Sequence, residues 1–380
     1  MSETITYKGI EKLQSFNSIQ EINDSILSLI PVSKKDIETT GVYVFGVGKL
    51  GQRIFDFLSL KGIKIHGFID NNTDRQKEKF NNLTVFSINT INKDALVYIA
   101  SAMYFNPIYK QLLGLGFTKI FSHLQAGILF LNETTFPVEM YQEKLTEDLF
   151  TNKDKYLQVF DLLEEDESKR VFDSLMSFRS TLNQKHIDTV YTKTEKEYFD
   201  GSVIKLSDSE VYIDGGGFDG DTAESFINFV KKKYKSVHVF EPDTALLNKA
   251  KVRLKEFDHI AYNPLGIYDK KTTLYFDITG GLDGIISNQG SVKIDTISID
   301  EYKDAQPTYI KLDIEGVEIQ AINGAVNTIK TLKPKLAIAS YHYPKHLWEI
   351  PLLIKSINPA YKLKLRHYTD SVFESVFYFI

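Results

Sequence analysis

The sequence of 380 residues contains no cysteine. Disulfides, thiolate catalysis and cysteine-ligated metal are therefore excluded, and a reducing compartment is allowed. Long blocks of like charge are also missing, and the formal net charge is only -5. This charge pattern does not predict binding to nucleic acid or to an anionic membrane surface.

Long apolar runs are missing too. The first residues, MSETITYKGI, are polar and lack the apolar core of a signal peptide. The longest apolar runs elsewhere are far shorter than the roughly 20 residues that a membrane helix needs. We therefore expect a cytoplasmic protein without a membrane span. The oligomeric state stays open, and a homodimer is one of the states that the sequence allows.

The length of the chain predicts more than one domain. Apolar residues at helical spacing predict a helical lead-in over residues 1–40 and a helical linker or lid over residues 133–205. Short apolar runs that alternate with helical patterns predict a small Rossmann-like α/β domain over residues 41–132 and a larger α/β domain over residues 206–380.

The larger α/β domain begins with a strand, a glycine-rich turn and a helix. Val211–Ile213 is a short run of β-branched and aromatic residues, typical of a buried strand, and a helical pattern runs from Thr222 to Lys233. Between them, Gly215, Gly217 and Gly220 have the spacing of a dinucleotide-binding turn, which alone is a weak signal. A nucleotide-like ligand is therefore expected at this turn.

Three acids, Asp214, Asp219 and Asp221, stand beside these glycines. Carboxylates repel a pyrophosphate, which prefers bare N–H groups at a helix N-terminus. They suit a ligand that combines a positive centre with hydroxyls. S-adenosylmethionine has a sulfonium, an ammonium and a ribose but no phosphate, so we predict it as the cofactor. We expect Asp214 near its ammonium end and place Asp219 in the same site.

Polar side chains follow the predicted strands of this domain, at the edge where open parallel sheets bind ligands. The strand ends read Asp214, Glu241, Asn263, Asp313 and His342. Helix capping explains one or two of these positions but not the whole set. Glu241 is placed to bind the ribose diol, and Asn263 to bond near the adenine. The backbone of Gly215 and Gly217 allows the methionine part to approach closely.

Methyl transfer requires alignment of donor and acceptor, and a hydroxyl acceptor must also lose its proton. The candidate catalytic residues are His342, Asp313 and Glu315. His342 is the natural general base because the ordinary pKa of histidine lies near neutrality, while a carboxylate could orient it or bind the acceptor. Asp313 with Glu315 could also hold Mg²⁺, but such pairs are common before helices without a metal, so no metal is expected.

Loops over the strand ends are expected to form the acceptor pocket. The segments concerned are Tyr191–Phe199, which could act as a lid, the glycine-rich Gly280–Gly290, and Tyr341–Trp348. A single helix is predicted from Val317 to Leu332. The identity of the acceptor does not follow from these segments.

The smaller α/β domain has a glycine-rich turn of its own. Gly46, Gly48 and Gly51 follow a buried strand, and Asp70 ends the next strand near the place of a ribose-binding acid. This turn contains Lys49 and no acid, so it could bind the phosphate of a nucleotide or nucleotide sugar. The alternative is that its glycines only allow close packing of strand and helix.

Residues from about 150 to 380 resemble the FkbM-type S-adenosylmethionine-dependent methyltransferases. The likeness lies in VYIDGGGFDGDT, VHVFEPD, IKLDIEGVEIQAINGA, KPKLAIASYHYPKHLWEIP and LKLRHY, in that order. The resemblance implies a class I methyltransferase fold with a seven-stranded sheet and a terminal antiparallel hairpin. It also implies O-methylation, often of sugar hydroxyls. By position it assigns the donor site to Asp214, Gly215, Gly217 and Glu241, and the acceptor side to Asp313–Gly316 and His342.

Two other functions stay open. An NAD(P)-dependent sugar-modifying oxidoreductase would bind its dinucleotide at Gly46–Gly51, although the acidic second turn disfavours a further pyrophosphate site. A non-catalytic protein that binds S-adenosylmethionine or a nucleotide sugar would have no need of Asp313 and His342 at strand ends. We therefore predict an S-adenosylmethionine-dependent O-methyltransferase that acts on a sugar, a nucleotide sugar or a glycan.

Overall fold

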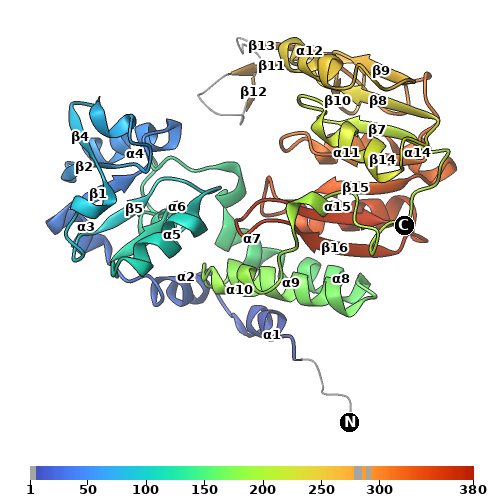
Figure 1. Ribbon diagram of the computed structural model, residues 1–380. Coiled ribbons are helices and arrows are strands. Elements are labelled where there is room, and N and C mark those ends of the chain that lie inside the picture. The colour runs from blue at the N-terminus through green and yellow to red at the C-terminus, as the bar shows by residue number, and fades with distance from the viewer. Residues whose placement is uncertain (1–5, 278–284, 288–291) are drawn as a thin grey trace. The chain divides into compact units, whose positions relative to one another are not determined.

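A computed structural model describes residues 6–277, 285–287 and 292–380 (Figure 1). The chain divides into two compact units. The first unit comprises Met1–Lys153, Asp173–Val190 and Asp370–Phe373, and the second comprises Asp154–Phe172, Tyr191–Thr369 and Glu374–Ile380. No helix among the described residues is both long enough and apolar enough to cross a membrane. The domain boundaries given above stay predictions.

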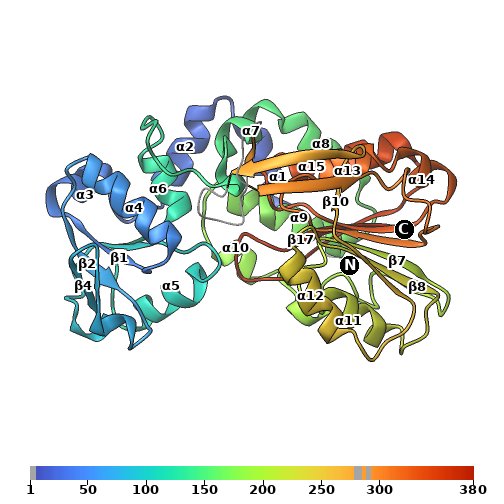
Figure 2. The ribbon, with the colours of Figure 1, turned by 90° about the horizontal axis from the view of Figure 1, so that it is seen from above.

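The first unit contains a six-stranded α/β sheet with the order β3-β4-β2-β1-β5-β6. Its strands are β1 (Val42–Phe45), β2 (Ile65–Ile69), β3 (Lys79–Phe80), β4 (Leu83–Phe86), β5 (Val97–Ile99) and β6 (Ile120–Ser122). Its helices are α1 (Lys8–Ser15), α2 (Ile19–Leu27), α3 (Lys34–Thr40), α4 (Lys49–Leu60), α5 (Phe105–Gly114), α6 (His123–Leu129), α7 (Leu145–Thr151) and α10 (Lys185–Asp188). The sequence order reverses at β1, so α4 and α5 cover opposite faces of the sheet (Figure 2).

The second unit is built on a seven-stranded sheet with the order β16-β17-β15-β14-β7-β8-β9. Its strands are β7 (Val211–Gly215), β8 (Ser236–Phe240), β9 (Ile260–Asn263), β14 (Tyr309–Leu312), β15 (Lys335–Ala339), β16 (Leu363–His367) and β17 (Ser375–Phe379). The helices of this part are α8 (Lys153–Leu162), α11 (Asp221–Phe229), α12 (Thr244–Arg253), α13 (Glu318–Asn323), α14 (Val326–Thr331) and α15 (His346–Ile357), while α9 (Asp166–Arg179) contributes to both units. β17 pairs antiparallel with β15 and β16, which confirms the predicted fold class and its terminal hairpin.

The direction of the chain along this sheet changes between β7 and β14. From β7 the chain proceeds through α11 and α12 to β8 and β9, whereas from β14 it proceeds to β15 in the other direction. Accordingly, α11 and α12 lie on one face of the sheet and α13 to α15 on the other (Figure 2). The ends of β7 and β14 therefore form the switch point at which open α/β sheets bind their ligands.

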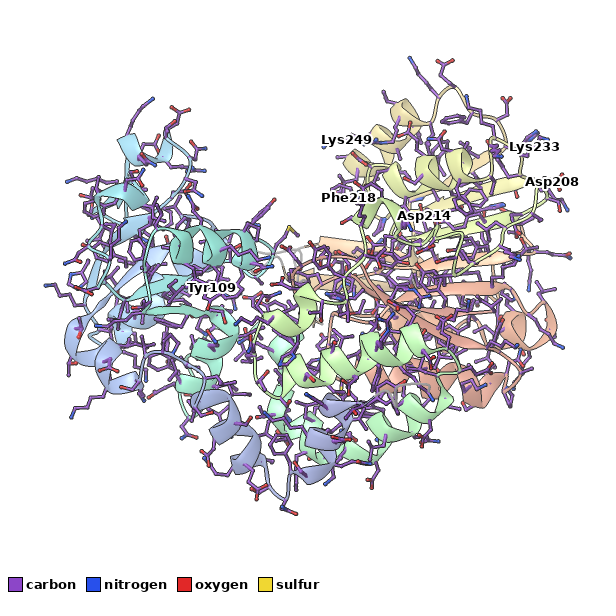
Figure 3. The ribbon with its side chains drawn as sticks, turned by 60° about the horizontal axis from the view of Figure 1, so that its bottom comes forward. Tyr109, Asp208, Asp214, Phe218, Lys233 and Lys249 are labelled. Carbon is purple, nitrogen blue, oxygen red and sulfur yellow. The ribbon has the colours of Figure 1, made fainter. Side chains whose placement is uncertain are left out.

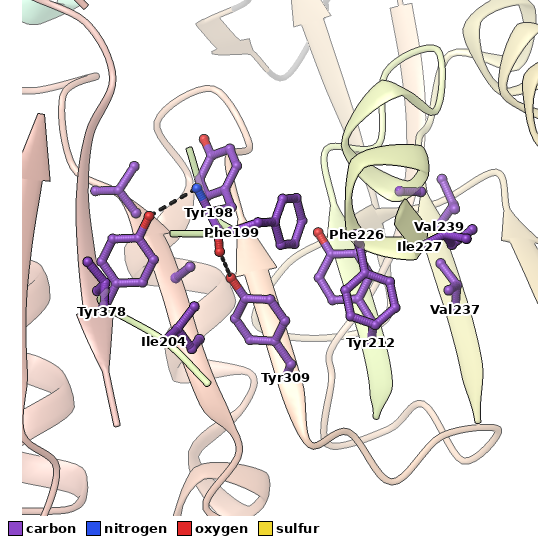
Figure 4. Packing of buried hydrophobic residues seen from close by; sticks show 14 of the residues in the cluster. Tyr198, Phe199, Ile204, Tyr212, Phe226, Ile227, Val237, Val239, Tyr309 and Tyr378 are labelled. Carbon is purple, nitrogen blue, oxygen red and sulfur yellow. Dashed lines mark hydrogen bonds between the residues drawn. The ribbon is translucent and has the colours of Figure 1, made fainter. Parts of the chain in front are cut away.

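Aromatic residues fill the core beside β7 (Figure 4). The ring of Tyr212 stacks on Phe226 with a centroid distance of 4.4 Å and on Tyr309 at 5.2 Å. The N–H of Tyr198 donates to the Tyr378 hydroxyl at 3.0 Å, and the Tyr309 hydroxyl donates to the Tyr198 carbonyl at 2.6 Å. The end of the segment predicted as a lid is therefore packed in the core, and its role as a lid stays a prediction.

A second, smaller sheet is inserted between β9 and β14. It has the order β10-β13-β11-β12, from β10 (Gly266–Ile267), β11 (Thr272–Asp277), β12 (Ile285–Ser287) and β13 (Val292–Ile297). β11 and β13 flank the Gly280–Gly290 loop. Apart from β12, that loop lies outside the described residues.

Two predicted helices are shorter in the structure. The helix predicted from Val317 to Leu332 is divided into α13 and α14 at Gly324, where a Cβ would lie 2.2 Å from the carbonyl oxygen of Tyr268. This close approach of another backbone requires glycine, which is a poor helix former. The helix predicted to reach Lys233 ends at Phe229, since the residues that follow include two with positive φ.

Candidate active site

The glycine-rich turn after β7 is pressed against the neighbouring strands. Gly216 has a φ of +75°, and a Cβ there would lie 1.8 Å from the carbonyl oxygen of Asp313. A Cβ on Gly217 would lie 2.3 Å from Cγ1 of Val239. The N–H groups of Gly216 and Gly217 donate to the Phe240 carbonyl at 3.1 and 2.9 Å. Only glycine fits these positions without moving the ends of β8 and β14.

A buried ion pair supports the turn from within the sheet. Lys311 and Asp214 are register partners on β14 and β7, with Nζ 3.2 Å from Oδ1, and their side chains are 2% and 0% exposed. Nζ also donates to the carbonyls of Gly215 and Gly216 at 3.1 and 2.7 Å. Burial alone would lower the pKa of Lys311, but the Asp214 carboxylate raises it above its usual value. Asp214 therefore holds the turn through Lys311, and its contact with a cofactor stays a prediction.

Glu241 follows β8, and both of its carboxylate oxygens accept backbone N–H groups. Oε2 accepts from Phe218 at 3.0 Å and Oε1 from Asp243 at 2.8 Å. The side chain is largely buried, and this burial raises the pKa of the carboxyl group. Each oxygen keeps a lone pair for a further donor such as a hydroxyl. Figure 3 marks Phe218, which is exposed on this turn, together with Asp214.

Two other predicted cofactor residues are engaged by the protein. Oδ2 of Asp219 lies 2.7 Å from Nη2 of Arg253, whose Nε donates to the Asp219 carbonyl at 3.0 Å. Asn263 ends β9, and its Nδ2 donates to the carbonyl of Val239 on β8 at 3.2 Å. Asp219 thus links the start of α11 to α12, and Asn263 links two strands. Ligand contact by either residue stays a prediction.

Asp313, Glu315 and His342 are brought together at the ends of β14 and β15. Nε2 of His342 lies 3.5 Å from Oδ1 of Asp313 and 3.5 Å from Oε2 of Glu315. Burial would lower the pKa of His342, but the Glu318 and Asp313 carboxylates raise it well above its usual range. The His342 ring is buried, whereas Glu315, with a φ of +56°, is 52% exposed. The cluster of Asp313, Glu315 and His342 therefore extends from a buried ring to the protein surface.

Two tyrosines that the sequence analysis did not single out contact Asp313. The Tyr198 hydroxyl donates to Oδ2 at 3.1 Å, and the Tyr341 hydroxyl donates to Oδ1 at 2.9 Å. Both carboxylate oxygens are therefore held in place. No signal in the sequence distinguishes these two residues, because the chain contains 21 tyrosines.

Further carboxyl groups lie near Asp313. Burial, together with the charge of Asp313, raises the pKa of Glu374 to about 7. Burial and then Glu374 raise the pKa of Glu197 well above its usual value. Oε1 of Glu197 has no hydrogen-bond partner among the described residues. This side of the site thus contains acids that retain protons toward neutral pH.

Behind His342 lies a fully buried carboxylate, Glu318. Its Oε1 lies 3.1 Å from Nδ1 of His342, and its Oε2 lies 3.4 Å from Nδ1 of His346. Oε1 also accepts the N–H groups of Ile314 and Gly316 at 3.0 and 3.3 Å. Burial alone would raise the pKa of Glu318, but the two histidines lower it to about 2. The sequence signal for Glu318 is its position: it is an acid on the buried face of the helix predicted from Val317 to Leu332.

Most glycines and polar groups of the glycine-rich turn in the first unit are engaged in contacts within that unit. Gly46 has a φ of +114°, and a Cβ on Gly51 would lie 2.2 Å from the Gly46 carbonyl oxygen. The Asp70 carboxylate accepts the N–H groups of Val47 at 3.4 Å and Asn72 at 2.8 Å. By contrast, a Cβ on Gly48 would meet no atom of the described residues within 4 Å. Packing therefore explains two of the glycines, and nucleotide binding here stays a prediction.

Comparison with protein families yields two matches. Residues 214–356 match the methyltransferase FkbM domain, and residues 38–120 match the domain described as C2185-like, N-terminal. The first match contains every candidate cofactor and catalytic residue of the second unit. No protein with a curated function matches the chain significantly.

A solved structure shows the same fold. A crystal structure of methyltransferase FkbM from Methylobacillus flagellatus KT matches with a TM-score of 0.78 and 21% identity, over 99% of this chain and 100% of that chain. A SAM-dependent methyltransferase from Aquifex aeolicus matches 52% of this chain and 97% of its own, with 12% identity and a TM-score of 0.31. A putative rRNA-methylase from Clostridium thermocellum matches 51% and 90%, with 9% identity and a TM-score of 0.30. The first of these extends over both units, whereas the other two scores are too low to support an argument.

Proposed function

This chain is an S-adenosylmethionine-dependent methyltransferase with an FkbM domain at residues 214–356, and we propose that it methylates a hydroxyl oxygen of a saccharide. The acceptor is a free sugar, a nucleotide sugar or a glycan. The enzyme class agrees with the methyltransferase expectation rather than with the oxidoreductase or non-catalytic alternatives. The oxygen acceptor and the saccharide are the proposed part.

The residues of the donor side fit the cofactor by their chemistry. S-adenosylmethionine supplies the electrophilic methyl group. Glu241 binds the ribose hydroxyls with the lone pairs that its two N–H donors leave free. The turn from Gly215 to Gly217 contacts the methionine part. Lys311 is already engaged by Asp214 and two carbonyls and so does not repel a sulfonium strongly. Asp219 and Asn263 complete the proposed donor set.

One observation favours an oxygen acceptor: Asp313 is fixed by two tyrosine hydroxyls beside His342. A carboxylate held in this way can accept a hydrogen bond from an acceptor hydroxyl, and Asp313 takes its proton during transfer. His342, whose raised pKa keeps its ring protonated near neutrality, orients Asp313 and stabilises its charge. Glu315, half exposed at the rim, binds a neighbouring hydroxyl. Carboxylates next to aromatic rings suit a sugar, which presents hydroxyls at its edge and an apolar face.

The test uses labelled S-adenosylmethionine with a panel of sugars, nucleotide sugars and oligosaccharides, next to amine and carboxylate acceptors. We expect label in an alkali-stable methyl ether of a saccharide, and loss of transfer for the analogue that lacks the methylated hydroxyl. Label in an ester or an amine, with none in any saccharide, would contradict the proposal. Asp313→Asn, tested in parallel, shows whether the transfer depends on this site.

We further propose that Gly46, Gly48, Gly51 and Asp70 bind the phosphate of a nucleotide or nucleotide sugar within the first unit. The observation that favours it concerns Gly48, the residue before α4: within the described part of the chain, no atom fills the space beside it and no side chain caps the helix. Calorimetry with uridine and adenosine diphosphates, on the wild type and on Lys49→Ala, tests it. Absence of binding by the wild type would contradict the nucleotide site but would not affect the proposal of methyl transfer.

A further inference from the structure

Three buried side chains, Glu318, His342 and His346, present ligand atoms that converge on one place in the second unit. Nδ1 of His342 lies 3.1 Å from Oε1 of Glu318, and Nδ1 of His346 lies 3.4 Å from Oε2. Each of the three residues offers an atom within 4.8 Å of the others. Yet, within the described part of the chain, neither ring nitrogen of His342 nor Oε2 of Glu318 has a hydrogen-bond partner. Unsatisfied buried atoms this close together are costly unless another group lies between them.

The three residues are held by the fold. Glu318 is the first residue of α13, His346 is the first residue of α15, and His342 lies between β15 and α15. Their exposed fractions are 0%, 1% and 5%. Glu318 is also fixed by the N–H groups of Ile314 and Gly316. The ligand atoms are therefore positioned in advance and shielded from competing water.

We propose that Glu318, His342 and His346 bind one divalent transition-metal ion of the zinc type. Two imidazoles and one carboxylate are a donor set that zinc accepts, with one position left for a further ligand. With metal–ligand bonds of about 2.0–2.1 Å, neighbouring ligand atoms of a tetrahedral site lie about 3.3 Å apart. Each imidazole Nδ1 lies at about that spacing from one oxygen of Glu318, His342 at 3.1 Å from Oε1 and His346 at 3.4 Å from Oε2, so the two oxygens of the carboxylate face the same ion position. Mg²⁺ and Ca²⁺, which require oxygen ligands, do not suit the site.

The ion would change the role of His342. With Nδ1 on the metal, the remaining ring proton lies on Nε2, which faces Asp313 and Glu315 at 3.5 Å. His342 then donates to these carboxylates and orients them, and Asp313 is the group that accepts the proton of the acceptor. The metal site itself does not rest on the proposed methyl transfer, so its occupancy is measured without any acceptor.

The experiment is a titration of the chelator-treated, tag-free protein with Co²⁺, followed by displacement with Zn²⁺. The chain has no cysteine, so the visible absorption of bound Co²⁺ reports nitrogen and oxygen ligands only. We expect one equivalent of Co²⁺ with the intense bands of tetrahedral coordination. Glu318→Gln and His346→Asn should each weaken binding by roughly 100-fold or more, because each removes a ligand.

The matched control is His238→Asn. His238 is a buried histidine of the same unit whose ring bonds Ser236 at 2.9 Å and Tyr302 at 3.0 Å, and its replacement should leave Co²⁺ binding unchanged. Zn²⁺ should also raise the thermal midpoint of the wild type and of this control, but not of Glu318→Gln.

Equal Co²⁺ affinity of the wild type and Glu318→Gln would overturn the proposal. The proposal would also be overturned if the wild type bound less than one equivalent of Co²⁺ in tetrahedral coordination. This second result does not depend on the folding of any variant. Binding of S-adenosylhomocysteine by each variant verifies that it is folded, since none of the three ligands belongs to the donor side.

Discussion

The buried ion pair between Lys311 and Asp214 leads to a quantitative prediction about the free energy of unfolding. Lys311→Met keeps the length of the side chain but leaves the Asp214 carboxylate, 0% exposed, without its counter-ion. Removing one partner of a buried ion pair typically costs about 3–5 kcal/mol. The free energy of unfolding of the second unit should fall by this amount. Affinity for S-adenosylhomocysteine should fall too, because Nζ no longer holds the carbonyls of Gly215 and Gly216.

The assay is urea unfolding followed by fluorescence of Trp348, which is the only tryptophan in the chain and belongs to the second unit. Lys345→Met is the control, since its pair with Glu349 is a partly exposed i,i+4 contact at 3.1 Å that contributes less than about 1 kcal/mol. The double variant Lys311→Met with Asp214→Leu should recover about 1–3 kcal/mol relative to the sum of the single losses. A loss below about 1 kcal/mol for Lys311→Met, or simple additivity in the double variant, would refute the reasoning.

Two further predictions concern turnover and pH. Asp313→Asn should slow methyl transfer by about 10²–10⁴-fold while leaving the Kd of S-adenosylhomocysteine nearly unchanged; single-turnover kinetics and calorimetry measure the two, and equal loss in both would indicate a structural role instead. In the first unit, burial lowers the pKa of His123 to about 3, below its ordinary 6.5. The folded state therefore disfavours the protonated ring, so stability is fully present above the ordinary pKa and is lost as pH falls toward 3. At about pH 5 the loss should be about 2 kcal/mol, seen as faster hydrogen exchange in α6 of the wild type. His123→Asn should lack this pH dependence, and the same pH dependence in both proteins would contradict the assignment.

The fold of the second unit was predictable because its signals are local and consistent. Apolar strands, acids at their ends and a terminal hairpin indicate an open sheet, and the strands are where those patterns place them. Local patterns fail where another segment decides the outcome. The break between α13 and α14 depends on Gly324 meeting the backbone of Tyr268, a contact between residues far apart in the sequence.

The candidate site was predictable in its charged strand ends but not in its supporting contacts. Asp313, Glu315 and His342 are brought together as the strand order implies. The sequence does contain a signal at Lys311: a lysine within an apolar strand needs an anion, and Asp214 is its register partner. Tyr198 carried none, because its contact with Asp313 depends on how the preceding segment enters the core.

The identity of the donor site is tested most directly by calorimetry with S-adenosylhomocysteine. The wild type should bind with a Kd below the order of 10² µM, and Glu241→Ala should weaken binding by about 10- to 100-fold, since a charge-assisted, paired contact is lost. Glu224→Ala, which removes a carboxylate of α11 paired with Arg253, should bind as the wild type does. Absence of binding by the wild type would contradict the account, and unchanged affinity in Glu241→Ala would show that the ribose lies elsewhere.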